Sequence, residues 1–512
     1  MRSTVSISRM NRPAWSCLLA ACFFLGTSPR SQSSEIPCKP MSLFSDHMVL
    51  QRDMPVPVWG TAAPGDAIAI EFAGQRKSTA ADATGKWQIT LDPLEASSTP
   101  RQMLIHSAKT EKTCTLNDLL VGELWICSGQ SNMEMPVGDG YRPDVYPGVV
   151  NFREEVATAD HPKIRVFLVD HQTAARPAPD VPTPGWKVCS PESVSRFSAA
   201  GYFFARHLHE HLQVPVGMIS AAWSSTTAEA WSSPAVLRSV PQTARLLDVL
   251  EARLAKADPA AKAPPIRRED PAALFHGMIA PLIPCAMRGV IWYQGESNAR
   301  SASDYQKLFP ALIRGWREAW AMPPPFRPGA PGGDFPFLFV QLAAYGGKPK
   351  QPVENGWANL REAQAMALKL PNTGMAVAID IGDAKRIHPP NKQEVGRRLG
   401  LLARAIAYHE HIEASGPQYQ SMRVEGDKIH LAFEYSGGGL MVKGGGSLTG
   451  FAIAGEDVKW HPAHAGIAGS EVIVTSPHAP RPLAVRYGWA NNPDCNLLNK
   501  AGLPASPFRT DR

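Results

Sequence analysis

Long hydrophobic runs are almost absent from this sequence of 512 residues. The run from Ala14 to Gly26 is too short to span a bilayer comfortably, because a transmembrane helix needs about 20 apolar residues. Arginines precede this run and small polar residues follow it, which is typical of a secretory signal peptide. We therefore expect residues 1–34 to be a signal peptide and the mature protein to be exported, whether periplasmic, extracellular or lipid-anchored. An uncleaved anchor and lipidation at Cys22 are the alternatives.

Cysteine and clustered positive charge are also scarce. Of the eight cysteines, Cys17 and Cys22 fall in the predicted signal peptide, and the rest are too scattered for a dense disulfide framework or a zinc knuckle. The net charge is +6, but four arginines precede residue 31 with no acidic residue among them, which leaves about +2 for the remainder. With no basic block in that remainder, nucleic acid and anionic membranes are not expected partners.

Short β-like segments separated by turn residues occupy residues 35–117, which predicts an N-terminal domain resembling a β-sandwich. Four such segments stand out: Met48–Leu50, Val56–Trp59, Ala67–Ile70 and Trp87–Thr90. No cluster of catalytic residue types accompanies them. After residue 412 the pattern is again β-like with glycine-rich turns, so residues 413–512 are predicted to form a C-terminal β-rich region.

Residues 118–412 alternate apolar runs with amphipathic stretches, which predicts an α/β domain. The predicted strands are Leu124–Cys127, Val216–Ile219, Val290–Tyr293, Phe337–Val340 and Met375–Ile379. Apolar residues at helical spacing predict helices over residues 305–316 and 395–406. This alternation indicates a mostly parallel sheet covered on both faces, with its ligand site at the carboxyl ends of the strands.

Three polar segments follow strands of this domain: Ser128–Asn132, Gln294–Asn298 and Asp383–Pro389. A serine at a strand end, a polar loop and a late histidine are the components of nucleophilic acyl transfer. Serine needs a base to take its proton, and the tetrahedral oxyanion needs donors already in place. Each segment alone is commonplace, so their joint position at strand ends carries the hypothesis of a hydrolase.

The segment Trp125–Val137 resembles the nucleophile segment of the sialate O-acetylesterases, a branch of the SGNH hydrolases. The resemblance covers nearly all of the chain after residue 34. It includes Met48–Arg52, Trp292–Asn298, Ile387–Pro389 with Asn391–Lys392, Val485–Tyr487 and Gly502–Asp511.

This resemblance implies a flavodoxin-like three-layer α/β/α catalytic domain flanked by β-rich regions. It implies removal of O-acetyl groups from sialic acids or related glycans, without a metal or another cofactor. By the matched motifs Ser131 is the nucleophile and His388 the general base. The Ser131 amide supplies one oxyanion donor, with Gln294 or Asn298 as side-chain candidates for another. Glu296 either orients its loop or touches the sugar, and a structural hydrogen-bonding role is an equal alternative.

Two departures from the family pattern affect the site. Trp223 is followed by Ser224 and Ser225 where the family has paired glycines, so we expect the Ser225 amide to face the oxyanion only if the loop does not require a positive φ. Lys385 stands where SGNH hydrolases often have an Asp, three residues before the histidine. Asp383 is therefore the predicted acid of the triad, with a backbone carbonyl as the alternative partner of the imidazole.

Two other functions compete with this interpretation. An acetylesterase acting on plant polysaccharide, such as xylan or xyloglucan, would use the same catalytic residues, because specificity lies in the surrounding loops. A catalytically inactive glycan-binding protein is the alternative of another class, and intact Ser131 and His388 argue against it. The sequence predicts neither the oligomeric state nor the pairing of the cysteines.

Overall fold

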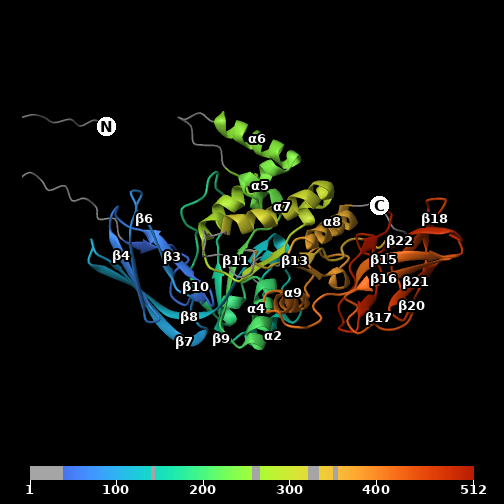
Figure 1. Ribbon diagram of the computed structural model, residues 1–512, viewed down its shortest axis with the longest axis horizontal. Helices are drawn as coiled ribbons and strands as arrows, with labels where there is room; N and C mark the ends of the chain where they lie inside the picture. Colours follow the sequence, from blue (N-terminus) through green and yellow to red (C-terminus); the bar gives the residue numbers. More distant parts are fainter. Residues whose placement is uncertain (1–37, 140–143, 257–265, 321–333, 350–355, 512) are drawn as a thin grey trace, which may run out of the picture. The chain divides into compact units, whose positions relative to one another are not determined.

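The computed structural model describes residues 38–139, 144–256, 266–320, 334–349 and 356–511 (Figure 1). The predicted signal peptide lies outside the described residues, as do Cys17 and Cys22. In the described part of the chain, no helix is long and apolar enough to cross a membrane. The structure is a mixed α/β fold, as the alternating pattern predicts.

Strands form the N-terminal region, and in two of them, Ala67–Phe72 and Lys86–Leu91, buried side chains alternate with more exposed ones. They are β1 Lys39–Pro40, β2 Val49–Gln51, β3 Val56–Thr61, β4 Ala67–Phe72, β5 Gln75–Ala80, β6 Lys86–Leu91 and β7 Ser97–Ser107. Strands β1, β3 and β6 form one antiparallel sheet, while β4 pairs with β5 and β7. In β4 the apolar residues Ile68, Ile70 and Phe72 face inward, because successive side chains of a strand point to opposite faces. All four segments predicted here are confirmed as strands.

Strand β8, Lys112–Gly129, belongs to two regions of the fold. Its first half pairs with β7, and its second half lies in the central sheet. The strand therefore passes residues 117 and 118, the predicted domain boundary, without a break. From Leu119 to Gly129 every residue is buried, which suits a strand covered on both faces. The division into domains stays a prediction.

The central sheet is mostly parallel, as predicted. Its other strands are β9 His161–Leu168, β10 Trp186–Cys189, β11 Val216–Ala222, β12 Gly289–Tyr293, β13 Phe337–Gln341 and β14 Thr373–Val377. The strand order is β10-β9-β11-β8-β12-β13-β14, and only β10 runs antiparallel to its neighbour. Since β8 lies between β11 and β12, the chain continues first to one side of β8 and later to the other. The carboxyl end of β8 is thus a topological switch point, where ligands of open α/β sheets bind.

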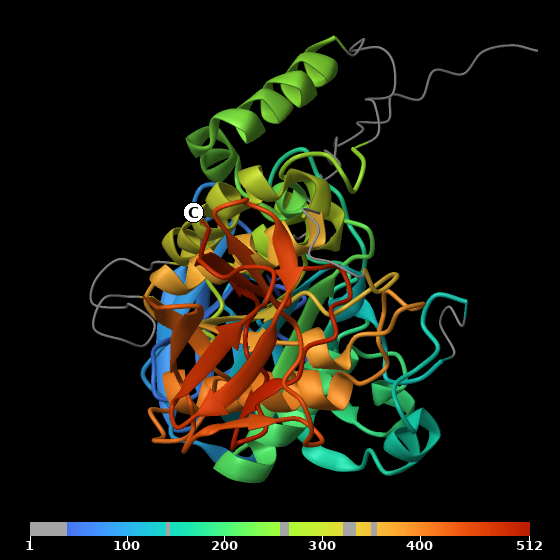
Figure 2. The same ribbon diagram turned by 90° about the vertical axis from the view of Figure 1, so that its right-hand side faces the viewer.

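Helices lie on both faces of this sheet (Figures 1 and 2). They are α1 Ser131–Glu134, α2 Phe152–Ala157, α3 Pro191–Val194, α4 Ala199–Leu212, α5 Pro234–Ser239, α6 Pro241–Ala255, α7 Ala302–Trp320, α8 Gly356–Ala365 and α9 Lys392–Ile406. Helix α4 packs against α9 on one side, and α7 packs against α8 on the other. The two predicted amphipathic helices are confirmed as α7 and α9, and the α9 stripe of Val395, Leu399 and Leu402 is buried.

The C-terminal region is β-rich, as predicted. Its strands are β15 Gln418–Glu425, β16 Lys428–Glu434, β17 Leu440–Val442, β18 Phe451–Gly455, β19 Trp460–Pro462, β20 His464–Ala468, β21 Glu471–Thr475, β22 Pro482–Tyr487, β23 Leu497–Asn499 and β24 Phe508–Arg509. They form two four-stranded sheets and one two-stranded sheet. Buried side chains of both larger sheets, including Leu431, Val474 and Val485, share one apolar cluster.

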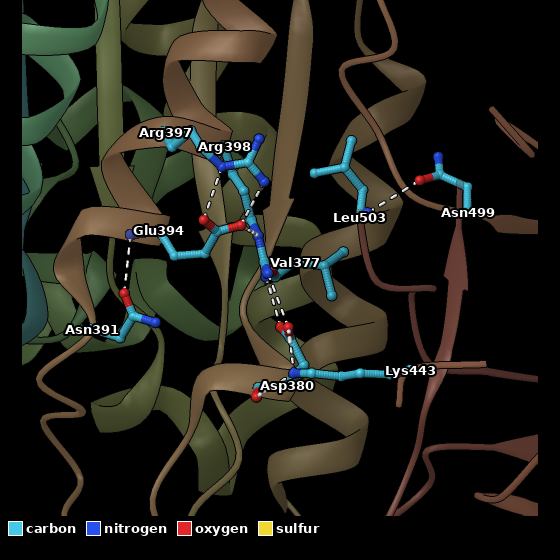
Figure 3. Close-up of polar contacts among 9 residues, drawn as sticks. All are labelled: Val377, Asp380, Asn391, Glu394, Arg397, Arg398, Lys443, Asn499 and Leu503. Atoms are coloured by element: carbon cyan, nitrogen blue, oxygen red, sulfur yellow. Dashed lines mark hydrogen bonds and ion pairs between the residues drawn. The ribbon is translucent and has the colours of Figure 1, made fainter. Parts of the chain in front are cut away.

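An ion network joins α9 to the segment after β14 (Figure 3). Arg398 holds both carboxylate oxygens of Asp380, with N–O distances of 2.6 and 2.9 Å, and its Nε donates to Glu394 at 2.8 Å. Lys443 of the C-terminal region reaches the same Asp380 carboxylate at 3.3 Å. Burial alone would raise the pKa of Asp380, but Arg398 and Lys443 outweigh burial and lower it. The network fixes the end of β14 against the helix that follows the histidine loop.

Candidate active site

Ser131 lies at the carboxyl end of β8, as the first residue of α1, and is 5% exposed. The preceding turn requires a glycine at 129, where φ is 136° and a Cβ would lie 2.2 Å from the carbonyl oxygen of Tyr293. The Gln130 amide donates to that same oxygen at 3.0 Å. Close approach of the two chain segments therefore places the serine beside the end of β12.

The structure brings the three predicted polar segments together. The Gln130 side-chain oxygen accepts the amides of Gly295 and Ser297 at 3.3 and 3.2 Å. The Asn132 side-chain nitrogen donates to the Glu296 carboxylate at 2.5 Å and to the carbonyl of Ile387 at 3.0 Å. The two residues that flank Ser131 therefore hold the loop after β12, and Asn132 also holds the histidine loop.

Lys392 completes this network from the first turn of α9. Its fully buried Nζ donates to Asn132 Oδ1 at 2.7 Å and to the carbonyl of Pro389 at 2.9 Å. Burial lowers the pKa of Lys392 to about 7, against the opposing effect of the Glu296 charge. Burial likewise raises the pKa of Glu296. The region beneath the nucleophile is thus a desolvated polar cluster that links three loops.

His388 lies half-buried in the loop between β14 and α9. Its Nδ1 contacts the carbonyl oxygen of Val145 at 3.1 Å. The ring of Tyr146 packs edge-on against the imidazole, with centroids 5.1 Å apart and an interplanar angle of 61°. A carbonyl at Nδ1 favours the tautomer that leaves Nε2 able to accept a proton.

The Asp383 carboxylate turns back onto its own loop. Its Oδ1 accepts the amides of Lys385 and Arg386 at 2.8 and 3.1 Å, which is a capping arrangement for a tight turn. The Val145 carbonyl oxygen lies 3.1 Å from His388 Nδ1, the ring nitrogen that a triad acid would contact. The role of Asp383 in a triad stays a prediction.

The turn after Trp223 requires a positive φ. The oxyanion role expected for the Ser225 amide is conditional on a turn without this requirement. Ser225 has φ 59°, a left-handed conformation that is uncommon for residues other than glycine. The paired glycines of the family would adopt this conformation without strain. The neighbouring Ser224 amide is occupied, because it donates to the Glu134 carboxylate at 2.7 Å. Because Ser225 itself adopts the left-handed conformation, its amide stays a backbone candidate for the oxyanion.

The predicted side-chain donors Gln294 and Asn298 hold buried loop structure. Gln294 Nε2 donates to the Thr226 carbonyl at 3.2 Å and to Asn298 Oδ1 at 2.7 Å. Asn298 Nδ2 donates to the Glu229 carboxylate at 3.0 Å. Both N–H groups of the Gln294 amide thus already have protein acceptors, since a side-chain amide has two donors. Service to an oxyanion stays a prediction for both residues.

Sequence reasoning missed several residues at this site: Asn132, Glu134, Val145, Tyr146, His171 and Lys392. One of them could have been found, because Lys392 lies three residues before Val395 and so on the apolar stripe that predicted α9. A lysine on a buried stripe signals a polar network. Asn132 and Glu134 lie inside the nucleophile motif, but nothing in the sequence gives their partners.

The described residues contain no group of three His, Cys, Asp or Glu side chains able to hold a metal ion. The six cysteines from Cys38 to Cys495 are free thiols. The chemistry that these side chains support is acyl transfer, with a serine, an oriented imidazole and backbone amides assembled at one sheet edge.

Known carbohydrate esterases resemble this chain in sequence and in structure. A model of the family "Carbohydrate esterase, sialic acid-specific acetylesterase" matches residues 121–405. Human sialate O-acetylesterase is 30% identical over 91% of this chain and 91% of its own length, and the mouse enzyme is 29% identical over 93% and 95%. The crystal structure of a carbohydrate acetylesterase from Xanthomonas citri is 38% identical, covers 93% of this chain and 100% of that chain, and superposes with a TM-score of 0.80.

Proposed function

The chain belongs to the sialic acid-specific acetylesterase family and is a carboxylic ester hydrolase, and from this premise we propose that it removes O-acetyl groups from sialic acids or related glycans. The observation that carries the proposal is the position of Ser131 at the switch point of the sheet, where Glu134 binds the Ser224 amide and Asn132 binds the Ile387 carbonyl beside His388. The family-wide match supports the same reaction.

In the proposed mechanism, Ser131 Oγ attacks the acetyl carbonyl while His388 Nε2 takes the serine proton. The oxyanion of the tetrahedral intermediate accepts the amides of Ser131 and Ser225. The Ser131 amide has no partner within its helix, because the first N–H groups of a helix never do. The imidazolium then protonates the departing sugar oxygen. Water repeats the sequence on the acetyl-enzyme, releasing acetate and regenerating the serine.

We propose that the Val145 carbonyl, rather than a carboxylate, orients the catalytic imidazole. The 3.1 Å contact at Nδ1 supports this, as does the capping position of Asp383. A carbonyl fixes the tautomer as an acid would, but it supplies less charge to stabilise the imidazolium. The alternative is a triad with Asp383, the carboxylate whose Oδ1 accepts the amides of Lys385 and Arg386.

We also propose a fold type for the catalytic domain. The parallel sheet with helices on both faces supports a flavodoxin-like three-layer domain of the SGNH hydrolase type, flanked by β-rich regions. Export of the mature protein is proposed from the N-terminal sequence pattern alone. An acetylated carbohydrate is the proposed partner, and no cofactor is required by the mechanism.

A second substrate class has an observation in its favour. The Xanthomonas citri protein, a carbohydrate acetylesterase, is 38% identical to this chain, whereas the human and mouse sialate O-acetylesterases are 30% and 29% identical. Acetylated plant polysaccharide, such as xylan or xyloglucan, is therefore the competing substrate for the same catalytic residues.

Two measurements test the proposal. Acetate release from acetylated sialic acids, compared with acetylated xylan and xyloglucan fragments, separates the two substrate classes by kcat/KM. Folded Ser131→Ala and His388→Ala proteins should each lose at least about a thousandfold in turnover of an aryl acetate, because the two side chains act as a unit. Retention of more than a few per cent of activity by either variant would contradict the assignment.

A further inference from the structure

We propose that Glu134 is a positioning residue that holds the oxyanion turn and the base in register with the nucleophile. The inference rests on the proposed function and deepens it. Glu134 is the last residue of α1, one turn after Ser131, and its side chain is 14% exposed. Its two carboxylate oxygens contact three other segments of the chain, two at the oxyanion turn and one beside the base.

The first set of contacts reaches the oxyanion turn. Glu134 Oε2 accepts the Ser224 amide at 2.7 Å, directly before the strained Ser225. Oε1 lies 3.0 Å from His171 Nε2. The His171 ring stacks on Trp223 with centroids 4.1 Å apart and planes within 4° of parallel. Glu134 therefore holds both residues that precede Ser225, one directly and one through a stacked ring.

The second contact reaches the base. The Tyr146 hydroxyl donates to Glu134 Oε2 at 3.0 Å, and Tyr146 is fully buried. Its ring packs edge-on against His388, and the preceding residue, Val145, presents its carbonyl to His388 Nδ1. Glu134 thereby fixes the segment that orients the imidazole, although it acts through Tyr146 and not on the ring itself.

Geometry explains why a carboxylate suits this position. A carboxylate offers about four acceptor sites on two oxygens, so one side chain can serve several donors from different directions. Hydrogen bonds to an ionised acceptor are shorter and roughly twice as strong as neutral ones. The contacts hold the left-handed turn at Ser225, where the usual glycines are missing, and the Tyr146 segment that packs against His388.

The test compares Glu134→Ala with Glu134→Gln on an aryl acetate, so that the result does not depend on the identity of the glycan. Misplacement of catalytic groups by about 1 Å costs about a hundredfold, so Glu134→Ala should lower kcat by that factor with KM changed less than about threefold. Glu134→Gln keeps acceptors for the Ser224 amide and Tyr146, so it should recover kcat to within about tenfold of wild type. The matched control is Glu155→Ala. Glu155 lies on α2, is similarly buried at 18% exposure and pairs with Arg206 at 2.7 Å, so kcat should be unchanged.

Normal kcat in folded Glu134→Ala would overturn the proposal, and so would a raised KM with unchanged kcat, which would place Glu134 in substrate binding. Equal inactivity of the Gln and Ala variants would also overturn it. If Glu134→Ala does not fold, Tyr146→Phe keeps the ring and removes only the hydroxyl, and should lower kcat about fivefold to tenfold, the value of one lost hydrogen bond of about 1 kcal/mol. Unchanged kcat in that variant would then count against the role. Failure of the catalytic assignment is separable, because it shows as activity in Ser131→Ala.

Discussion

Replacing Lys392 with methionine should remove a rise in stability with pH that we expect in the wild-type protein. Burial lowers the pKa of Lys392 from 10.5 to about 7 in the folded state, while the unfolded chain keeps the ordinary value. Between pH 7 and 10.5 the unfolded state therefore binds more protons, so the free energy of unfolding rises with pH. Below pH 7 the lysine is protonated in both states, and the cost of burying its charge is present in full.

The lowered pKa of Lys392 determines how much the free energy of unfolding changes with pH. A difference of one bound proton changes the free energy of unfolding by about 1.4 kcal/mol per pH unit, so the wild type should gain on the order of 2 kcal/mol between pH 7 and 9 from this group. Methionine has a similar length and no charge. In the variant Glu296 loses the neighbouring ammonium, so its raised pKa rises further and stability falls with pH through that value. Both contributions give the wild type the steeper rise.

Denaturant unfolding at pH 7, 8 and 9 measures the difference between wild type and Lys392→Met, in which the titration of groups other than Lys392 and Glu296 cancels. Lys385→Met is the matched control, because Lys385 is an exposed lysine in the loop before α9 and should leave the curve unchanged. Turnover of the folded Lys392→Met protein should also fall by at least about tenfold, since Asn132 and the Pro389 carbonyl lose their common donor. Parallel stability curves for wild type and variant would refute the reasoning.

Three further predictions follow from the site and its surroundings. Ser225→Gly should keep turnover within about twofold and leave the free energy of unfolding unchanged or about 1 kcal/mol higher, because relief of the left-handed strain offsets the entropy of glycine. Ser225→Pro, whose φ is fixed near −65°, should reduce turnover by about a hundredfold in steady-state assays. Asp383→Asn retains the acceptor for the Lys385 amide and should keep turnover within about threefold. A loss of about ten-thousandfold would show instead that Asp383 is the acid of a catalytic triad. Asp380→Asn breaks a buried pair with Arg398 and should lower the free energy of unfolding by about 3 kcal/mol, read from the denaturation midpoint, with turnover per folded molecule unchanged.

Much of the fold could be predicted because its strands are buried on both faces. Runs such as Val290–Tyr293 and Phe337–Val340 are short, apolar and bounded by polar loops, and each became a strand of the parallel sheet. The parallel order then brings the polar loops to one edge. Position along the chain and local pattern were enough to place Ser131 and His388 in the same region.

The orientation of the imidazole could not be predicted in the same way. His388 and Val145 are 243 positions apart, and a carbonyl oxygen is present at every residue, so no residue type marks the partner. Asp383 is the nearest carboxylate upstream of His388, and nothing in the sequence indicates that its Oδ1 accepts two amides of its own loop. The conformation of Ser225 was equally hidden, because serine is not a residue that usually signals a positive φ.

The continuity of β8 has a consequence for how the chain reaches this structure during synthesis. The partner of its first half, β7, leaves the ribosome just before it, so that pairing is local and early. The partners of its last residues, from Glu123 onward, begin only at Val216 and Gly289, so the apolar segment Leu124–Cys127 remains unpaired while many more residues are made. Unpaired apolar edges are where chains associate wrongly. The strand that carries the nucleophile to the centre of the sheet is therefore also the segment at which aggregation during expression or refolding should begin.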